Sequence, residues 1–210
     1  MIFDELSLAG AYLIAPDRAT DARGSFGRFY CEDEFASHGL ADRMVQGNLS
    51  YSAKAGTLRG MHYQVPPVGE AKFIRVLHGA IYDVIVDLRP WSTTFLQHGG
   101  VELSAESRVG IYVPPYFGHG HQALTDEVEI AYLVSERYTP GAERGLRHDD
   151  EALDISWPLP ISVISEKDLA WAPLDVGAIQ SEMASASPPG RDKSASPNAD
   201  SRQRTPESAR

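Results

Sequence analysis

Apolar and polar side chains alternate in many short stretches of the chain, and glycine, proline, aspartate or serine residues separate these stretches. Successive side chains of a strand point to opposite faces, so this alternation over four to eight residues predicts strands. We expect an opening strand within residues 1–16 and a turn followed by a strand within residues 21–30. Further strands are predicted over residues 45–51, 56–64, 72–77, 80–88, 99–103, 110–113, 122–124 and 128–134.

Helical periodicity is scarce by comparison. The best short helix is predicted over residues 33–40, with Asp33 as its N-cap and Gly39 at its end. Many short strands with closely spaced turns and few helices are typical of an antiparallel sandwich or barrel, and not of a βαβ sheet. No glycine-rich dinucleotide or phosphate loop is present.

The segment 56–67 concentrates a cation, an imidazole and an amide between glycines and a Pro-Pro pair, which suggests the floor of an active site. Strand alternation predicts that His62 and Gln64 share one face, while Arg59 lies on the other. After this segment, His78-Gly79 is predicted to reverse the chain into a hairpin of residues 72–88. The second of these strands is expected to have one packed face and one wetter face.

Composition supports one folded domain followed by a tail. The 210 residues are 42% hydrophobic and 23% charged, which is enough to bury a core in a single domain over residues 1–178. Residues 179–210 are rich in Ser, Ala and Pro and are predicted to be disordered, because they bury too little apolar surface to offset the entropy of ordering.

Charge and cysteine content exclude several classes of protein. The net charge of −10 argues against binding to nucleic acid, although a few local arginines and lysines can still hold one diphosphate. The single cysteine, Cys31, leaves no intramolecular disulfide, and no apolar run approaches the roughly 18 residues of a membrane span. We therefore expect a soluble, cytoplasmic protein that does not associate with membranes.

Three later clusters add candidate chemistry. His119 and His121 are expected to share a strand face. Tyr132 and Tyr138 would also share a face if their strand continues, and Ser165 to Asp168 are expected to form a polar turn. Each cluster also has a purely structural interpretation, because such residues are often at the surface or in packing positions. Their combination with residues 56–67 is what favours a site.

The sequence resembles the dTDP-4-dehydrorhamnose 3,5-epimerases of the cupin superfamily. The resemblance covers roughly residues 1–175 and keeps the family spacing. The matching positions are Arg23-Gly24 with Phe26; Gln46 and Asn48; Leu58 to Gln64; Lys72, Val76 and Gly79; Val84 and Asp87 to Arg89; Val101 to Glu106; Val113-Pro114, Phe117 and His119-Gly120; Glu143 and Gly145; Ile155, Trp157 to Leu159, and Ser165 to Asp168.

This resemblance implies an all-β, double-stranded β-helix jelly roll (cupin) barrel with few short helices, which forms a homodimer. It implies an isomerase that epimerises a nucleotide-linked 4-keto-6-deoxyhexose through an enolate, without a cofactor or a metal ion. In such a reaction a base removes a proton beside a ketone, a donor stabilises the oxyanion, and an acid reprotonates the opposite face.

The resemblance also assigns roles to residues. It implies His62 as the base, since an imidazole ordinarily titrates near pH 6.5, with Asp168 orienting its ring. Lys72 is expected at the enolate oxygen and Tyr132 as the acid. The expected substrate-binding residues are Arg59, Arg23 and Lys167 at the diphosphate, Gln46, Asn48, His119 and Glu143 around the sugar and nucleotide, and Phe26 and Tyr138 on the base.

Several positions depart from the family pattern and leave the substrate open. Arg28, Gly47 and Leu49 differ from the usual residues, and His121 stands where an apolar aromatic residue is usual. A mono-epimerase acting at C3 or C5 of another nucleotide sugar is therefore an alternative. A metal-dependent cupin is another, although His62, Glu70 and a later histidine make a poor metal triad. A non-catalytic barrel that binds sugar nucleotides is the third.

Overall fold

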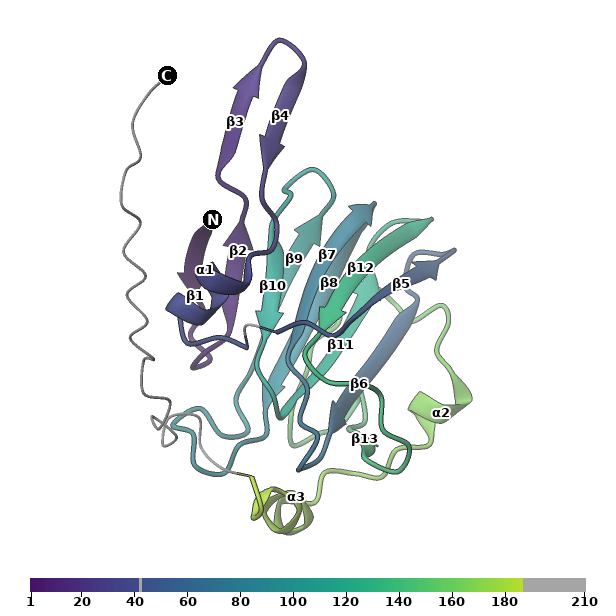
Figure 1. Ribbon diagram of the computed structural model, residues 1–210. Helices are drawn as coiled ribbons and strands as arrows, with labels where there is room; N and C mark the ends of the chain where they lie inside the picture. The colour runs from purple at the N-terminus through teal and green to yellow at the C-terminus, as the bar shows by residue number, and fades with distance from the viewer. Residues whose placement is uncertain (42, 187–210) are drawn as a thin grey trace, which may run out of the picture.

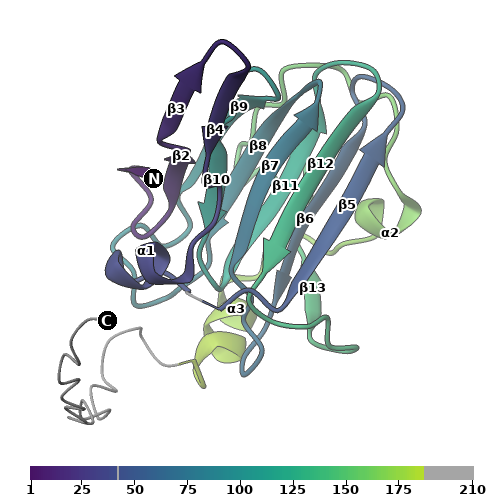
Figure 2. The same ribbon diagram turned by 45° about the horizontal axis from the view of Figure 1, so that its top comes forward.

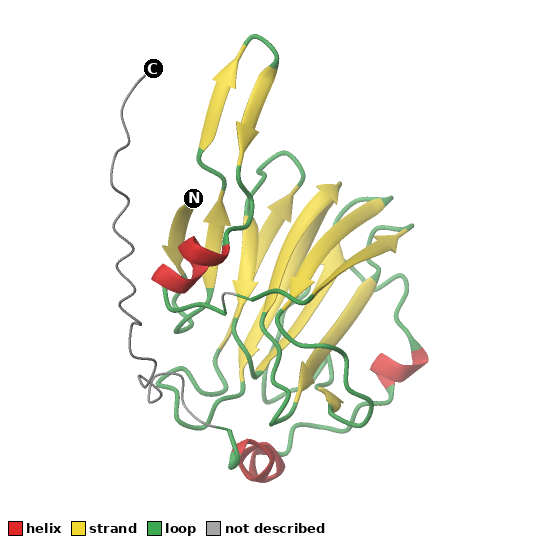
Figure 3. Ribbon diagram, in the orientation of Figure 1, coloured by secondary structure: helices red, strands yellow, loops and turns green. Residues whose placement is uncertain are grey.

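The computed structural model describes residues 1–41 and 43–186. Two antiparallel sheets face each other and form a jelly-roll barrel, with the short helices at its periphery (Figures 1 and 3). The predicted all-β fold is therefore confirmed. The six-stranded sheet has the order β1 (Ile2–Glu5), β2 (Tyr12–Ala15), β10 (Gly110–Val113), β7 (Lys72–His78), β12 (Val128–Val134), β5 (Gln46–Ser52). The five-stranded sheet has the order β13 (Glu143–Gly145), β6 (Leu58–Gln64), β11 (Phe117–Ala123), β8 (Ala80–Asp87), β9 (His98–Ser104).

A separate two-stranded hairpin, β3 (Arg18–Asp21) and β4 (Gly24–Gly27), projects away from both sheets (Figures 1 and 2). Nearly all of its residues are exposed. The hairpin therefore adds no core to the barrel, and its two strands are held by their own ladder.

The apolar core between the two sheets lies beside β9 and β10. It contains inward-facing residues of both sheets, such as Ile74, Ile81, Ile85 and Ile111, each at most 1% exposed. Burial of each such side chain contributes roughly 1.5–3 kcal/mol. This core fixes the spacing of the sheets and leaves the interior near β5 and β6 free for polar side chains.

A second apolar cluster covers the outer face of the five-stranded sheet. Val84 and Val86 pack there against residues from the C-terminal part of the chain, including Ile179 and Met183 of α3 (Val176–Met183). The alternation predicted for residues 80–88 is confirmed, but the expected wetter face is wrong. Both faces of β8 are buried because α3 and neighbouring loops cover its outer side.

The domain boundary predicted at residue 178 cuts through helix α3. Asp175 caps this helix by accepting a hydrogen bond from the backbone N–H of Ala178, and Ile179 and Met183 are 3% and 1% exposed. The folded part therefore extends beyond residue 178, because two apolar side chains of the helix complete the outer cluster. The rest of the predicted disordered tail, residues 187–210, lies outside the described residues.

The predicted hairpin of residues 72–88 is wrong. Strand β7 pairs with β10 and β12, whereas β8 pairs with β11 and β9 in the other sheet. Gly79, at a φ of +76°, turns the chain sharply from one sheet to the other. The turn is fixed because Ala80 donates its N–H to the Thr125 hydroxyl, and a side chain at Gly79 would meet that hydroxyl at 2.4 Å.

Helix α1 (Glu32–Ser37) begins one residue earlier than expected. Its N-cap is Cys31, which makes no side-chain cap, so Asp33 lies in the first turn and not at the cap. The position of the helix is set by Phe35, which is fully buried and makes edge-on contacts with Phe73 and Tyr112. Tertiary packing thus outweighs the local capping preference.

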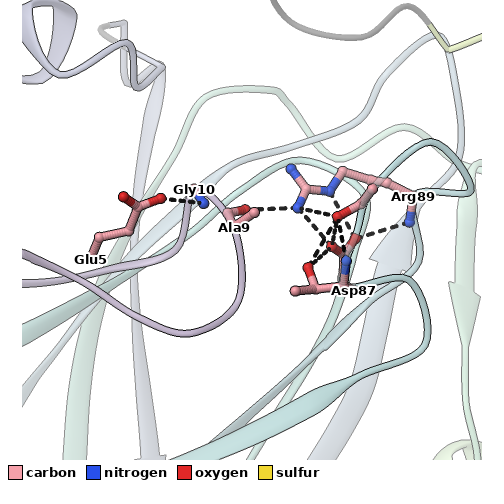
Figure 4. Close-up of polar contacts among 7 residues, drawn as sticks. Glu5, Ala9, Gly10, Asp87 and Arg89 are labelled. Atoms are coloured by element: carbon pink, nitrogen blue, oxygen red, sulfur yellow. Dashed lines mark hydrogen bonds and ion pairs between the residues drawn. The ribbon is translucent and has the colours of Figure 1, made fainter.

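The end of β8 is anchored by a buried ion pair (Figure 4). The Asp87 carboxylate accepts hydrogen bonds from Arg89 Nε at 2.8 Å and from the Ser92 and Thr94 hydroxyls. Arg89 Nη2 donates to Asp87 at 2.7 Å and to the carbonyl of Ala9 at 2.7 Å. This network ties the loop between β1 and β2 to the five-stranded sheet.

Candidate active site

A cavity of about 630 Å³ lies between the two sheets, at the side of the barrel away from the main core. It is lined from the six-stranded sheet by residues of β5, β7 and β12, and from the five-stranded sheet by residues of β6 and β11. All but two of the predicted site residues line it. These are His62, Lys72, Tyr132, Asp168, Gln46, Asn48, Arg59, His119, Tyr138, Glu143 and Lys167.

His62 of β6 and Asp168 of α2 (Glu166–Leu169) form a hydrogen-bonded pair. The distance from His62 Nε2 to Asp168 Oδ1 is 2.6 Å, and Asp168 Oδ2 accepts the backbone N–H of Gly60 at 3.3 Å. Ser165 is the N-cap of α2 and accepts the N–H of Asp168. The predicted polar turn at residues 165–168 is thus a capped helical turn that presents a carboxylate to the imidazole.

The Asp168 carboxyl group is ionised in this setting. Burial raises its pKa, but the hydrogen bond and charge of His62, together with the Gly60 N–H and the Ser165 side chain, outweigh burial and lower the pKa below its ordinary value. An ionised carboxylate can only accept hydrogen bonds. His62 Nε2 therefore carries the ring hydrogen, and Nδ1 is the ring atom left to accept a proton.

Arg59 lines the same cavity as His62, which corrects the prediction that the two lie on opposite faces of β6. In the strand register, His119 of β11 lies opposite His62 and His121 lies opposite Arg59. Three residues along β6 therefore span the same length as two residues along β11. This bulge at Gly60 shifts the alternation by one residue. Gly60 is required there, because a Cβ atom would lie 2.5 Å from the Cα of Gly120.

Gln64 does not join the cavity. Its side-chain oxygen accepts the backbone N–H of Thr139 at 3.0 Å, and the residue is 3% exposed. The amide that sequence reasoning placed beside His62 therefore supports the loop before β13.

A second histidine–carboxylate pair lies opposite the first. His119 Nε2 is 2.9 Å from Asp83 Oδ2, and Asp83 is fully buried on β8. Sequence reasoning assigned no role to Asp83. Its position in the strand could have indicated its burial, because the alternation of β8 places Asp83 on the inward face with Ile81 and Ile85.

Lys72 and Tyr132 face the cavity from the six-stranded sheet. Lys72 Nζ lies 3.2 Å from Glu70 Oε1, and both side chains are largely buried. Burial raises the pKa of Tyr132, the negative charge of Glu70 raises it further, and Arg59 opposes these effects. The phenol therefore stays protonated at neutral pH. Glu70 also lines the cavity, and sequence reasoning gave it no role in epimerisation.

His121 shares a strand face with His119, as predicted, and the two ring centroids are 6.1 Å apart. Burial lowers the pKa of His121 to about 3, and the nearby His119, Arg59, His62 and Lys72 lower it in the same direction. This imidazole is neutral throughout the physiological pH range.

Polar side chains at the rim of the cavity are linked to each other. Glu143 Oε2 pairs with Lys167 Nζ at 2.6 Å and accepts the hydroxyl of Tyr138 at 3.4 Å. Gln46 donates to the Asn48 side chain at 2.8 Å. Three elements that are distant in sequence thus meet around one opening.

Arg23 and Phe26 do not line this cavity. They lie on the projecting hairpin β3–β4, where Arg23 pairs with Asp21 and Phe26 is 82% exposed. Within one chain, the structure separates these two residues from the other predicted substrate-binding residues.

Two findings bear on other classes of site. Over residues 1–41 and 43–186, no three His, Cys, Asp or Glu side chains form a group able to hold a metal ion. In the same part of the chain, every helix is too short or too polar to cross a membrane.

Comparison with known proteins places the chain in a family. The family model described as dTDP-4-dehydrorhamnose 3,5-epimerase matches residues 5–175. A dTDP-4-dehydrorhamnose 3,5-epimerase of Methanothermobacter thermautotrophicus is 43% identical over 176 residues, which are 82% of this chain and 94% of the relative. A dTDP-4-dehydrorhamnose 3-epimerase of Streptomyces niveus is 38% identical over 78% of this chain and 79% of the relative.

Solved structures agree with this assignment. The dTDP-4-dehydrorhamnose 3,5-epimerase of Bacillus anthracis, crystallised with TDP and PPi bound, superposes with a TM-score of 0.79 at 39% identity. The superposition covers 82% of this chain and 99% of that one. The chain belongs to the dTDP-4-dehydrorhamnose 3,5-epimerase family of isomerases.

Proposed function

We propose that the protein converts dTDP-4-dehydro-6-deoxyglucose to dTDP-4-dehydrorhamnose by inverting the carbons beside the ketone, as a step of deoxysugar biosynthesis. One observation carries the proposal. His62 enters the cavity from the five-stranded sheet, whereas Tyr132 enters it from the six-stranded sheet. Inversion needs a base and an acid on opposite faces of the sugar ring, and two opposed walls supply them.

His62 takes the proton from the carbon beside the ketone. Asp168 holds Nε2–H, so that Nδ1 is free to accept the proton, and it stabilises the imidazolium that forms. The carboxylate keeps its charge during the step, because hydrogen bonds have already lowered its pKa.

Lys72 stabilises the oxyanion of the enolate, and Tyr132 returns a proton from the other face. The ammonium of Lys72 is held by Glu70, which limits the positions that it can adopt in the cavity. Tyr132 suits the role of an acid, since its raised pKa keeps the phenol protonated until a carbanion forms beside it.

The rim residues bind the nucleotide diphosphate. Arg59 and Lys167 supply positive charge for the diphosphate, and Tyr138 provides an exposed aromatic ring for the base. Gln46, Asn48, His119 and Glu143 surround the sugar and its nucleotide. The Arg59 guanidinium is already oriented by Ser52 and by the carbonyl of Tyr51.

We further propose that two copies of the chain form a homodimer, in which the β3–β4 hairpin of one copy reaches the cavity of the other. Arg23 and Phe26 would then join a site that they cannot reach within their own chain. The outer face of the six-stranded sheet supports this arrangement, because Leu49, Tyr51 and Leu77 are between 50% and 69% exposed there. Sedimentation analysis tests the dimer, and mixed dimers of Phe26→Ala and His62→Ala chains test the shared site through partial recovery of activity.

The reaction requires only proton transfers between side chains and substrate, so we propose that it needs no cofactor. Treatment with a chelator should leave the rate unchanged. The cytoplasmic location and the inversion of both carbons, rather than one, remain predictions.

Incubation with dTDP-4-keto-6-deoxyglucose in deuterated water tests the proposal. Deuterium at both C3 and C5 supports the double epimerisation, deuterium at one carbon indicates a mono-epimerase, and no incorporation refutes the proposal. His62→Ala should abolish the exchange, whereas Tyr132→Phe should allow exchange without inversion. His98→Ala, at an exposed position of β9, is the matched control and should behave as the wild type.

A further inference from the structure

His121 forms no hydrogen bond with any other residue in the described part of the chain. The residue is 5% exposed, and it lines the cavity. Within the described residues, no donor or acceptor lies at hydrogen-bonding distance from either ring nitrogen. The polar atoms of side chains as buried as this one are nearly always paired. A group left unpaired at a cavity wall points to a ligand as its partner.

The position of His121 narrows the choice of ligand atoms. Along β11, His119 lies opposite His62 of the proton-transfer pair, and His121 lies opposite Arg59. In the proposed function, the ketone binds near His62 and the diphosphate binds near Arg59. His121 therefore lies beside the part of the sugar between the ketone and the diphosphate.

The charges around His121 define its hydrogen-bonding character. Cationic or protonatable groups face it from three strands: Arg59 and His62 of β6, Lys72 of β7 and His119 of β11. Two acidic groups lie close by, and each is paired with a basic residue. Asp83 of β8 lies opposite His121 in the strand register and is bound to His119, and Glu70 is paired with Lys72. The imidazole is thus neutral and offers one donor and one acceptor, which match an alcohol hydroxyl better than a phosphate.

We propose that His121 determines specificity by hydrogen-bonding the C2 hydroxyl of the sugar, the carbon between the diphosphate-bearing C1 and C3. This inference rests on the proposed function for the orientation of the sugar. Phenylalanine is the informative replacement, because it fills the same space without a polar atom. A neutral hydrogen bond of this kind changes affinity by about tenfold at most.

Calorimetric binding of two stable ligands tests the inference: dTDP-rhamnose, and dTDP-rhamnose that lacks the C2 hydroxyl. The wild type should bind the ligand with the C2 hydroxyl about tenfold more tightly than the ligand without it. His121→Phe should bind the two ligands equally, because it loses affinity only for the ligand with the hydroxyl. A purely structural role would instead weaken both ligands by the same factor. His121→Asn keeps a donor and an acceptor and should retain part of the preference, while His98→Phe, at the surface, should retain all of it.

Two results overturn the inference: a wild type without preference, or a His121→Phe variant that keeps the preference. Binding is measured without turnover, so this outcome is independent of the proposed reaction. Deuterium exchange in the wild type reports on the reaction separately. If a thermal melt shows that His121→Phe does not fold, the ligand preference of His121→Asn is compared with that of the wild type to decide the question.

Discussion

Replacement of Asp168 by asparagine is the most direct test of the pair formed with His62. The substitution keeps the shape of the side chain but replaces one acceptor oxygen by an NH₂ donor. In the native structure both carboxylate oxygens accept hydrogen bonds, Oδ1 from His62 and Oδ2 from the Gly60 backbone. An amide has only one acceptor oxygen, so it cannot satisfy both donors.

Either orientation of the amide damages the site. If the oxygen faces Gly60, the NH₂ group faces His62 Nε2 and favours the tautomer with hydrogen on Nδ1, which is the atom that must accept the substrate proton. If the oxygen faces His62, the NH₂ group opposes the Gly60 N–H in a buried position. In both cases the negative charge that stabilises the imidazolium is lost. The same substitution in a serine-protease triad lowers kcat about 10⁴-fold, and we expect a loss of 10³- to 10⁴-fold here.

The assay is the rate of deuterium incorporation beside the ketone, measured with saturating and with limiting substrate. The loss should occur mainly in kcat, because in the proposed mechanism Asp168 orients His62 and does not bind the nucleotide. Glu166→Gln, at an exposed position of the same helix, is the matched control and should keep the wild-type rate. A folded Asp168→Asn enzyme within tenfold of the wild-type rate would refute the assignment of Asp168.

Three further predictions follow from single contacts. Lys72→Ala should lose several hundredfold in kcat, because one oxyanion donor contributes about 2.7–4 kcal/mol to the transition state, and steady-state kinetics measures this loss; a loss below tenfold would contradict the role. Asp87→Asn should lower the free energy of unfolding by about 3 kcal/mol in denaturant titrations, because it leaves Arg89 buried without its partner. Burial raises the pKa of Asp87, but the hydrogen bonds from Arg89, Ser92 and Thr94 outweigh burial and lower the pKa. The stabilisation by Asp87 is therefore present above about pH 4 and is lost as the pH falls further. If the difference in unfolding free energy between the wild type and Asp87→Asn grew on acidification, this prediction would be contradicted. Gly60→Ala should abolish soluble expression or exchange, because its Cβ would overlap the Gly120 backbone at 2.5 Å; wild-type yield and exchange would contradict this.

Strands with clean alternation could be predicted from the sequence. The predicted bounds of β10 and β12 coincide with the structure, because each is an uninterrupted apolar or alternating run. Strand β11 was predicted only over residues 122–124, whereas it begins at Phe117. Its glycines obscured the signal, yet they are needed for packing, since a Cβ at Gly120 would lie 2.7 Å from the sulfur of Met61.

The pairing of strands could not be predicted from local signals. A β-branched run, an X-Gly pair and a second run are equally compatible with a hairpin and with a corner between two sheets. What selects the corner at Gly79 is contact with Thr125, which is distant in sequence. The same limitation explains the error at Arg59, because the bulge in β6 is visible only in its register against β11.

The contact between His62 and Asp168 depends on how the segment after residue 158 docks onto the barrel. The Gln122 side chain exchanges two hydrogen bonds with the backbone of Leu159, and the N–H of Leu58 donates to the carbonyl of Val163 at 2.8 Å. These bonds lead the chain along the start of β6, so that Asp168 arrives beside His62 two residues into the first turn of α2. Since no strand alternation links the two residues, neither could be paired by periodicity. Their 2.6 Å contact is therefore a product of this docking.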